Sequence, residues 1–320
     1  MDVVALGELL IDFTMVSADR EGYPTMAAHP GGAVANFLAA IAKFGGETAL
    51  MGKVGNDAFG KLLLGTLEQA GIGTSGMVVD DSVFTTLAFV TLDETGDRSF
   101  SFARKPGADT QLRAEELELS LIDRAKVLHF GTLSLTDEPA KTATRKAIAY
   151  AKEKGKLITF DPNLRKPLWH SLQEAKEQML WGLEQADVVK ISDEEVEFLF
   201  DMGVEEGAKY ILETFGMKLV FVTCGADGCY FCNPAASGHV PGLQGIRVVD
   251  TTGAGDIFGG SAVWKLLQTG KSPEMLTEEQ LRDVTAFACK AAGLSTTKPG
   301  GISSVPAMQD VESTASGRSI

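Results

Sequence analysis

Residues 246–260 constrain this chain more than any other segment. A β-branched run at 246–249 predicts a strand, small and glycine-rich residues follow, and an apolar run from Ile257 predicts a helix. A glycine turn that leads into a helix offers free N–H groups and the positive end of the helix dipole to an anion. Asp256 adds a carboxylate at this point. The combination suits phosphoryl transfer, because amides hold the phosphoryl group while a carboxylate takes the proton of the attacking hydroxyl.

Two other interpretations of this segment stay open. Asp256 could simply cap the helix, because aspartate is common at helix starts. The glycines could form a dinucleotide-binding turn, but that motif needs a second strand with an acidic residue about 20 residues later. Residues 264–281 are expected to form a helix, a turn and another helix, which disfavours that motif. No Gly-Lys-Ser/Thr closes the glycine run, so a Walker-type loop is absent there.

Length and charge narrow the class of protein. The 320 residues suffice for one large α/β domain or two small ones. The net charge of −14 argues against nucleic acid or an anionic membrane surface as a partner. The N-terminus is expected to enter a strand directly, without a signal peptide or a membrane span, which predicts a cytoplasmic location.

Apolar strands and helical patterns alternate along most of the chain. This alternation predicts an α/β fold in which helices cover both faces of a doubly wound, mostly parallel sheet. The expected strands are 3–7, 48–54, 127–131, 157–161, 188–192 and 220–223, and the expected helices are 34–43, 59–69, 139–154 and 172–186.

Two segments depart from the alternation. Residues 10–26 and 85–102 read as strands without helices between them, and the second contains a hairpin signal. They predict a small sheet, and a lid above the carboxyl ends of the main strands is its natural place, because ligands bind there. The lid segments are expected at about 10–30 and 80–108, and residues 312–320 are expected to fray.

The cysteines allow two interpretations. Cys224, Cys229 and Cys232 have a spacing that matches a plant-type iron–sulfur pattern, with Cys289 far downstream. The favoured interpretation is two strands around an Ala-Asp-Gly turn, in which the cysteines pack as small apolar side chains.

Two motifs carry a family resemblance. Asp-Thr-Thr-Gly-Ala-Gly-Asp at 250–256 resembles the C-terminal signature of the ribokinase-like (pfkB-type) carbohydrate kinases, and Gly-Gly-Ala-Val-Ala-Asn at 31–36 resembles their N-terminal signature. The resemblance covers about residues 3–306. It implies one kinase domain over 1–320, a three-layer α/β/α sandwich with a mostly parallel central sheet and a small β-sheet lid. Within the family the chain is most similar to bacterial and plant fructokinases, through residues 5–12, 52–60, 160–169 and 190–199.

The resemblance implies an ATP-dependent kinase that phosphorylates the 6-hydroxyl of D-fructose. Asp256 would be the catalytic base, and the backbone of Gly253, Ala254 and Gly255 would stabilise the transferred phosphoryl group. The sugar would be bound by Asp12, Gly31, Gly32, Asn36, Arg104 and Asp256. Without the resemblance, Arg104 reads as an exposed lid charge and Asp12 as an ordinary turn residue.

The resemblance also implies the nucleotide and metal sites. ATP would be held by Asn163, Arg165, Ser192, Glu195, Thr223, Gly225, Gly228, Gly253, Gly255 and Cys289. Glu195 would organise hydrated Mg²⁺. A K⁺ ion would be bound mainly by backbone carbonyls of Asp250, Thr252, Ser295, Lys298, Gly300 and Ser304.

Other functions remain open at this point. A related kinase could act on 2-keto-3-deoxygluconate, whose carboxylate Arg104 and Lys105 could hold. A sugar or nucleotide sensor on the same fold would need no base, so the intact Asp256 disfavours it. A dinucleotide-dependent oxidoreductase is disfavoured by the missing strand. Exposed lid strands could pair two subunits into a homodimer.

Overall fold

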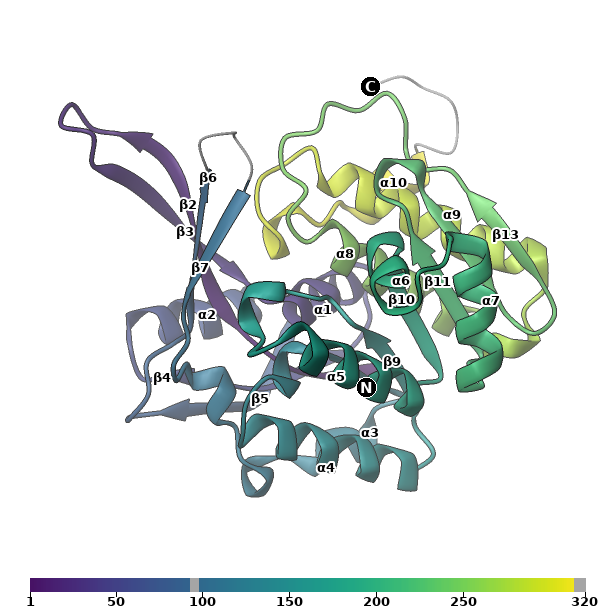
Figure 1. Ribbon diagram of the computed structural model, residues 1–320, viewed down its shortest axis with the longest axis horizontal. Coiled ribbons are helices and arrows are strands. Elements are labelled where there is room, and N and C mark those ends of the chain that lie inside the picture. Colours follow the sequence, from purple (N-terminus) through teal and green to yellow (C-terminus); the bar gives the residue numbers. More distant parts are fainter. Residues whose placement is uncertain (93–97, 314–320) are drawn as a thin grey trace.

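The computed structural model describes residues 1–92 and 98–313, and its main body is built on one large sheet (Figure 1). Nine strands lie in the order β13-β12-β11-β10-β9-β8-β1-β4-β5. Neighbours from β5 to β11 pair in parallel, whereas β12 and β13 add antiparallel pairs at one edge. The strands are β1 (Val3–Leu6), β4 (Thr48–Gly55), β5 (Ile72–Asp80), β8 (Val127–Gly131), β9 (Leu157–Asp161), β10 (Val188–Ser192), β11 (Leu219–Thr223), β12 (Cys229–Cys232) and β13 (Ser237–Val240).

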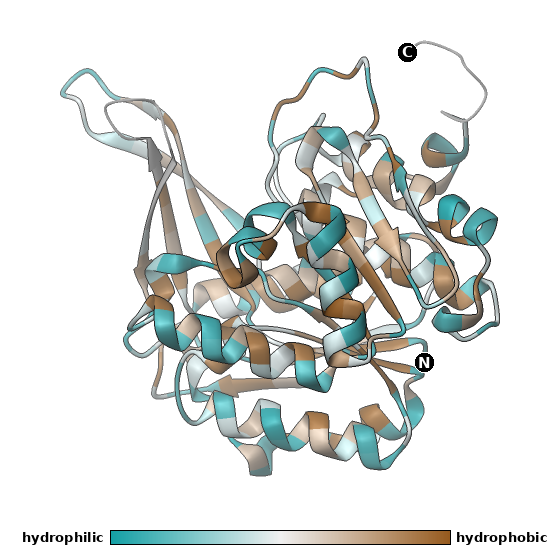
Figure 2. Cartoon of the chain, turned by 45° about the vertical axis from the view of Figure 1, so that its right-hand side comes forward, coloured by the Kyte–Doolittle hydropathy of each residue, from teal (hydrophilic) through white to brown (hydrophobic). Residues whose placement is uncertain are grey.

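Helices cover both faces of this sheet. Val4 and Leu6 of β1 belong to one apolar cluster, and Val3 and Ala5 belong to another, because successive side chains of a strand point to opposite faces. Figure 2 shows the apolar colour on the strands and the hydrophilic colour mainly on the outer sides of the helices. The three-layer prediction is therefore confirmed. One face carries α3 (Leu119–Arg124), α4 (Ala140–Glu153), α5 (Leu172–Gln185), α6 (Asp193–Phe200) and α7 (Val204–Phe215); the other carries α1 (Ala33–Lys43), α2 (Ala58–Gln69), α8 (Ala254–Gln268), α9 (Glu278–Ser295) and α10 (Met308–Ser313).

The packing of α8 on α1 depends on Gly260. A Cβ atom at this position would lie 2.1 Å from the backbone oxygen of Phe37, so only glycine allows the two helices to approach this closely. The contact brings Asn36 of α1 near Asp256 of α8, which precedes Gly260 by one helical turn. The helix packing therefore positions two residues that lie far apart in the sequence.

A second sheet forms the expected lid. Its strands are β2 (Leu10–Ala18), β3 (Pro24–Gly31), β6 (Leu87–Leu92) and β7 (Arg98–Ala103), in the order β3-β2-β6-β7. Figure 1 shows this sheet standing beside the main body, with the β2–β3 hairpin extending farthest outward. Phe13 of β2 packs edge-on against Phe59 of α2, with 5.5 Å between the ring centroids, which joins the lid to the body.

Most predicted elements are present, but one strand is not. Residues 246–249 form no strand, and the side chains of Val248 and Val249 are more than half exposed. Among residues 1–92 and 98–313 no strand pairs with this run, and Val249 N and Asp250 N both donate to Thr296 O. β-branched residues favour strands only where a pleated neighbour packs against them, and here that neighbour is missing. The following helix, α8, begins at Ala254 rather than at Ile257.

The helix, turn and helix expected at 264–281 are confirmed by α8 and α9. The segment after the glycine turn therefore lacks the strand that a dinucleotide-binding motif requires. The expected hairpin turn near 93–97 and the tail at 314–320 lie outside the described residues.

The two strands predicted around the cysteines are confirmed. β11 and β12 pair antiparallel, and Cys229 and Cys232 belong to apolar clusters on opposite faces of the sheet. Within residues 1–92 and 98–313, no group of histidine, cysteine and acidic side chains is arranged to hold a metal ion. In the same ranges, no helix has the length and apolar character needed to cross a bilayer.

Candidate active site

Asp256 lies in the first turn of α8 and is 7 % exposed. Its Oδ2 accepts a hydrogen bond of 2.9 Å from Asn36 Nδ2. The described contacts give the N-terminus of α8, which begins after Gly253, no capping bond from a side chain. The carboxylate is therefore turned to Asn36 and away from the helix backbone, which disfavours the interpretation of Asp256 as a simple cap.

A cavity of about 730 Å³ lies in front of this carboxylate, between the lid and the carboxyl ends of the main strands. Its volume falls in the range of small-molecule sites. Eleven of the predicted site residues line it: Asp12, Gly31, Gly32, Asn36, Asn163, Arg165, Asp250, Thr252, Gly253, Asp256 and Gly300. The lid strands, the start of α1, the loop after β9 and the turn before α8 thus converge on one space.

Asp12 enters the cavity from the lid. It lies opposite His29 in the β2–β3 pair, and Gly31 leaves room for it, since a Cβ there would lie 2.2 Å from Asp12 Oδ2. The pKa of the Asp12 carboxyl is raised to about 6, mainly by burial; Arg165 acts to lower it and Asp250 acts to raise it. An acceptor placed in this way suits the hydroxyl groups of a sugar.

Asn36 has one unused polar atom. Its Nδ2 donates to Asp256, but its Oδ1 has no hydrogen-bond partner among the described residues although it is buried. A Cβ at Gly301 would lie 2.1 Å from this oxygen, so the glycine keeps the space beside it open. A buried acceptor without a partner is unfavourable, and a hydroxyl group of a bound ligand would satisfy it.

Lys190, whose side chain is 13 % exposed, lies beneath the start of α8. Lys190 Nζ is 3.0 Å from Asp161 Oδ2, and a Cβ added to Gly255 would lie 2.9 Å from the same nitrogen. Burial alone would lower the pKa of Lys190, but the carboxylates of Asp161, Glu195 and Asp256 together raise it. Lys190 is therefore protonated, and its positive charge lies beside the glycine turn for which the sequence predicts anion binding.

The pKa of Asp256 responds to the same surroundings. The pKa is raised to about 6, mainly by burial; Asp161 also acts to raise it, whereas Lys190 and the hydrogen bond from Asn36 act to lower it. A base with this pKa is ionised at neutral pH and accepts a proton more readily than an exposed aspartate does.

Sequence reasoning did not select Lys190 as a functional residue. A signal was available, because a lysine in the otherwise apolar strand 188–192 has to be paired when that strand is buried. The same reasoning applies to Glu8, which is 3 % exposed, lines the cavity and lies between two apolar strands.

Glu195 links two of the predicted nucleotide segments. Its Oε1 accepts from Leu164 N at 2.7 Å, and its Oε2 accepts from Ser192 N at 2.9 Å. Burial raises the pKa of this carboxyl above its usual value. Because both oxygens already accept backbone N–H groups, the arrangement fits contact with a metal ion through water rather than directly.

The remaining nucleotide residues lie outside the cavity but along the same edge of the sheet. Ser192 and Thr223 are register partners at the carboxyl ends of β10 and β11. Gly225 begins a short 3₁₀ helix, η5 (Gly225–Asp227), and Gly228 follows it. Cys289 is buried in α9, where it packs in the cluster that also contains Cys229.

Two loops predicted for the monovalent cation lie side by side. Asp250 Oδ1 accepts from Thr252 N at 2.9 Å, and Asp250 Oδ2 accepts from Gly300 N at 3.0 Å. Ser295 is the last residue of α9, Lys298 follows it, and Ser304 ends η7 (Ile302–Ser304). The residues are therefore brought together from segments about 50 residues apart.

Arg104 does not lie where the sequence interpretation expected it. It is 5 % exposed, so the reading as an exposed lid charge is wrong. Among the described residues on the cavity wall, Glu8 and Leu133 are present but Arg104 is not. Its guanidinium lies behind that wall, bound to Asp109, Thr136 and the backbone of Leu133.

A comparison of the sequence with protein-family profiles identifies the family to which the chain belongs. The profile described as pfkB family carbohydrate kinase matches residues 1–308. The chain belongs to the pfkB family of carbohydrate kinases. It is 42 % identical over 313 residues to "Fructokinase-1" of Zea mays, which covers 97 % of this chain and 96 % of that protein. It is 41 % identical over 318 residues to "Probable fructokinase-4" of Arabidopsis thaliana, with 98 % and 97 % covered.

Solved structures of this family share the whole architecture. The fructokinase from Xylella fastidiosa with bound ATP matches with a TM-score of 0.89 and 30 % identity over 97 % of both chains. A fructokinase double mutant from Vibrio cholerae, with fructose, ADP and potassium ion bound, matches with a TM-score of 0.86 and 32 % identity over 98 % of both chains. The pfkB-type kinase described here is therefore a carbohydrate kinase with a ribokinase-like fold.

Proposed function

We propose that this pfkB-family kinase transfers the γ-phosphoryl group of ATP to the 6-hydroxyl of D-fructose. The observation that carries the proposal is the pair of Asn36 and Asp256, which presents a buried carboxylate and an unused amide oxygen to a sugar-sized cavity. The fructokinase names of the similar plant proteins and the fructose-bound Vibrio cholerae structure support fructose as the sugar.

In this mechanism Asp256 takes the proton of the 6-hydroxyl as its oxygen attacks the γ-phosphorus in line, and ADP leaves. The N–H groups at Gly253–Gly255 face the charge that develops on the phosphoryl oxygens, and the Lys190 ammonium behind Gly255 adds positive potential to this turn. Asp12 and Asn36 hold the other sugar hydroxyls, and the lid excludes water that would otherwise hydrolyse ATP.

Metal ions fit the same arrangement. Glu195 would hold hydrated Mg²⁺ through water, because both of its oxygens are bound to backbone donors. Mg²⁺ would neutralise part of the phosphate charge. Backbone carbonyls of the two adjoining loops at Asp250 and Gly300 would bind K⁺ beside the turn before α8, an assignment that rests on the family resemblance.

The test is an ADP-release assay with ATP, Mg²⁺ and K⁺ across a panel of sugars. Fructose is expected to have the highest kcat/KM among fructose, ribose, tagatose and 2-keto-3-deoxygluconate. A preference for another sugar would keep the chemistry and reject the substrate assignment. Turnover of no sugar, with nucleotide still bound, would support the sensor alternative.

The pH dependence of kcat/KM offers an independent check. Asp12 and Asp256 both have pKa values of about 6. Asp256 has to be ionised to take the proton of the hydroxyl, and protonation of Asp12 removes part of its capacity to accept hydrogen bonds from the sugar. We expect log kcat/KM for fructose to fall below about pH 6 with a slope between one and two, because one protonation prevents proton transfer and the other weakens sugar binding. The Asp12→Asn variant should lower that slope toward one, and a profile that stays flat down to about pH 5 would contradict both assignments.

Several predictions about the whole protein stay predictions. The similar proteins bear fructokinase names, and Arg104, invoked for the carboxylate of 2-keto-3-deoxygluconate, lies behind the cavity wall, so the alternative substrate is not favoured.

The exposed lid residues Met15, Val16 and Tyr23 are consistent with a homodimer formed through the lid. A cytoplasmic location and a single kinase domain over 1–320 are further expectations.

A further inference from the structure

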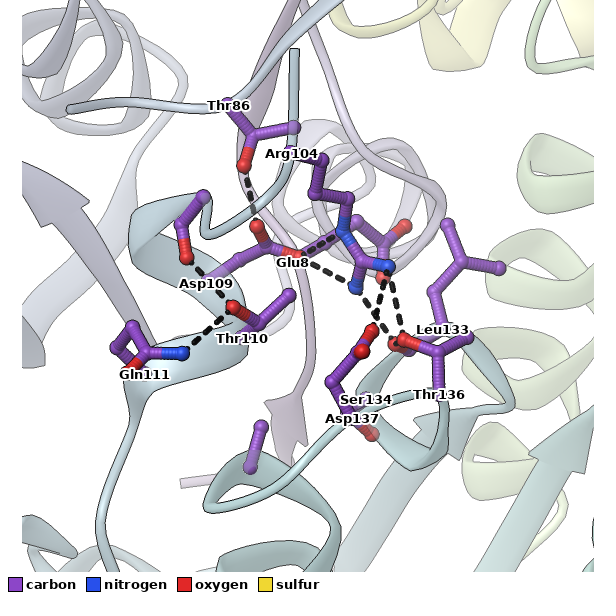
Figure 3. A network of polar contacts seen from close by, with 12 residues as sticks. Glu8, Thr86, Arg104, Asp109, Thr110, Gln111, Leu133, Ser134, Thr136 and Asp137 are labelled. Carbon is purple, nitrogen blue, oxygen red and sulfur yellow. Dashed lines mark hydrogen bonds and ion pairs between the residues drawn. The ribbon is translucent and has the colours of Figure 1, made fainter. Parts of the chain in front are cut away.

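The chain passes between the lid and the main body four times. The connections are residues 7–9, 32, 81–86 and 104–107, which join the lid strands to β1, α1, β5 and the 3₁₀ helix η1 (Ala108–Gln111). A motion of the lid has to bend the chain at these places. Figure 3 shows a polar network of side chains gathered at this root of the lid.

Arg104 is the centre of the network. Its Nε donates to Asp109 Oδ2 at 2.8 Å, and its Nη2 lies 2.7 Å from the same oxygen. Nη1 donates to Thr136 Oγ1, and Nη2 donates to the backbone oxygen of Leu133, each at 2.8 Å. Most of the five N–H groups of the guanidinium are therefore already used by protein acceptors.

Asp109 and Glu8 extend the network to the other connections. Asp109 accepts a short hydrogen bond from Thr86, which precedes β6. Glu8, between β1 and β2, accepts from Ala33 N at the start of α1 at 2.6 Å. Burial raises the pKa of Glu8 to about 7, with Asp109 raising it and Arg104 lowering it, so these three groups interact electrostatically.

The network is buried and touches the cavity from behind. Arg104, Asp109, Thr86 and Thr136 are all at most 6 % exposed. Leu133 and Glu8 line the cavity; the backbone oxygen of Leu133 accepts from Arg104, and Glu8 is bound to Ala33 N. A change in the Arg104–Asp109 pair would therefore shift both the lid root and part of the cavity wall.

We propose that Arg104 and Asp109 are positioning residues: their buried ion pair fixes the lid root over the sugar cavity and sets the apparent affinity for the sugar without contact with it. A direct sugar contact would require Arg104 to give up bonds to Asp109, Thr136 and Leu133 in a buried place. Removal of Arg104 leaves the buried Asp109 carboxylate without its cation, and removal of Asp109 leaves Arg104, among the described residues, only the more distant ion pair with Asp137, at 3.7 Å. The kinetic part of the test rests on the proposed fructokinase activity.

A double-mutant cycle tests the proposal. Arg104→Gln and Asp109→Asn are each expected to raise the KM for fructose about tenfold, and the double variant should be no worse than either single one, because the two residues share one interaction. The KM for ATP and kcat should change by less than about threefold. Arg113→Gln, an exposed arginine in the same segment, is the matched control and should behave as the parent protein.

A direct sugar contact predicts a different pattern. Arg104→Gln would then raise the KM for fructose while Asp109→Asn would leave it nearly unchanged, and this result would overturn the proposal. Thr136→Val removes one hydrogen-bond acceptor of Arg104 and keeps the side-chain volume. It tests the proposal even if the Arg104 or Asp109 variants do not fold. It should raise the KM for fructose in the same direction by a smaller factor.

Hydrogen exchange of backbone amides tests the role of the Arg104–Asp109 pair independently of the proposed fructokinase activity. Without any substrate, the backbone amides of β2 and β6 should exchange faster in Asp109→Asn than in the parent protein, while those of β8 and β9 keep their protection. Unchanged exchange in β2 and β6 would refute the role at the lid root. If the parent protein does not phosphorylate fructose, only the substrate assignment fails, and the exchange result still decides the role of the pair.

Discussion

The Asp256→Asn variant is expected to lose kcat by about 10²- to 10⁴-fold, the range that a positioned general base contributes. An asparagine cannot accept the proton of the sugar hydroxyl, but its Oδ1 can still accept the bond from Asn36 Nδ2, so the local geometry should persist. The dissociation constants of fructose and ATP, measured by calorimetry, should therefore change little. Turnover is measured by ADP release at saturating substrates.

The control for this variant is Asp283→Asn. It makes the same chemical change on α9, where the side chain is 67 % exposed and pairs with Lys265. It should keep the parent kcat. A value of kcat near that of the parent in Asp256→Asn would remove Asp256 from its role as the base.

The Lys190→Met variant should affect both turnover and stability. It leaves the carboxylates of Asp161, Glu195 and Asp256 without their common counter-charge. We expect kcat to fall by about 10²- to 10³-fold, as when one electrostatic donor is removed from a transition state. The free energy of unfolding should fall by about 3–5 kcal/mol, the usual result of breaking a buried ion pair from one side. Urea unfolding and steady-state kinetics measure the two effects.

A second substitution separates these effects. In Lys190→Met combined with Asp161→Asn, the carboxylate paired with Lys190 is removed and those of Glu195 and Asp256 remain, so part of the stability should return while kcat stays low. If kcat returns together with stability, Lys190 acts only through the structure. Lys209→Met, at an exposed ion pair with Glu205, is the matched control and should leave kcat as in the parent enzyme.

The main sheet could be predicted from the sequence because its signals are local. Strands such as β8, β9 and β10 are short apolar runs between helical patterns, and the structure places them at the predicted residues. The run at 246–249 has the same local signal but no strand beside it, so it forms a loop. Pairing between strands is a long-range property that the composition of one segment does not contain.

The residues of the candidate active site could not be predicted from local sequence patterns alone. Asp256 and Asn36 were chosen because two motifs resemble those of a known family, since no periodicity links residues that far apart. Arg104 illustrates the limit of this approach. A position in a motif does not reveal whether a guanidinium faces the cavity or lies behind its wall, because that depends on acceptors such as Asp109 and Thr136, which other segments supply.

The hydrogen bond between Asn36 and Asp256 joins residues separated by 220 positions. A ribosome that adds about 5–20 residues per second needs on the order of 10–40 s to synthesise the chain between them. During that interval α1 exists without α8, and the apolar side of α1 that includes Phe37 has no permanent cover. During synthesis the chain is therefore prone to aggregation before its active site exists. A truncated product that ends before α8 lacks Asp256 and exposes the apolar side of α1.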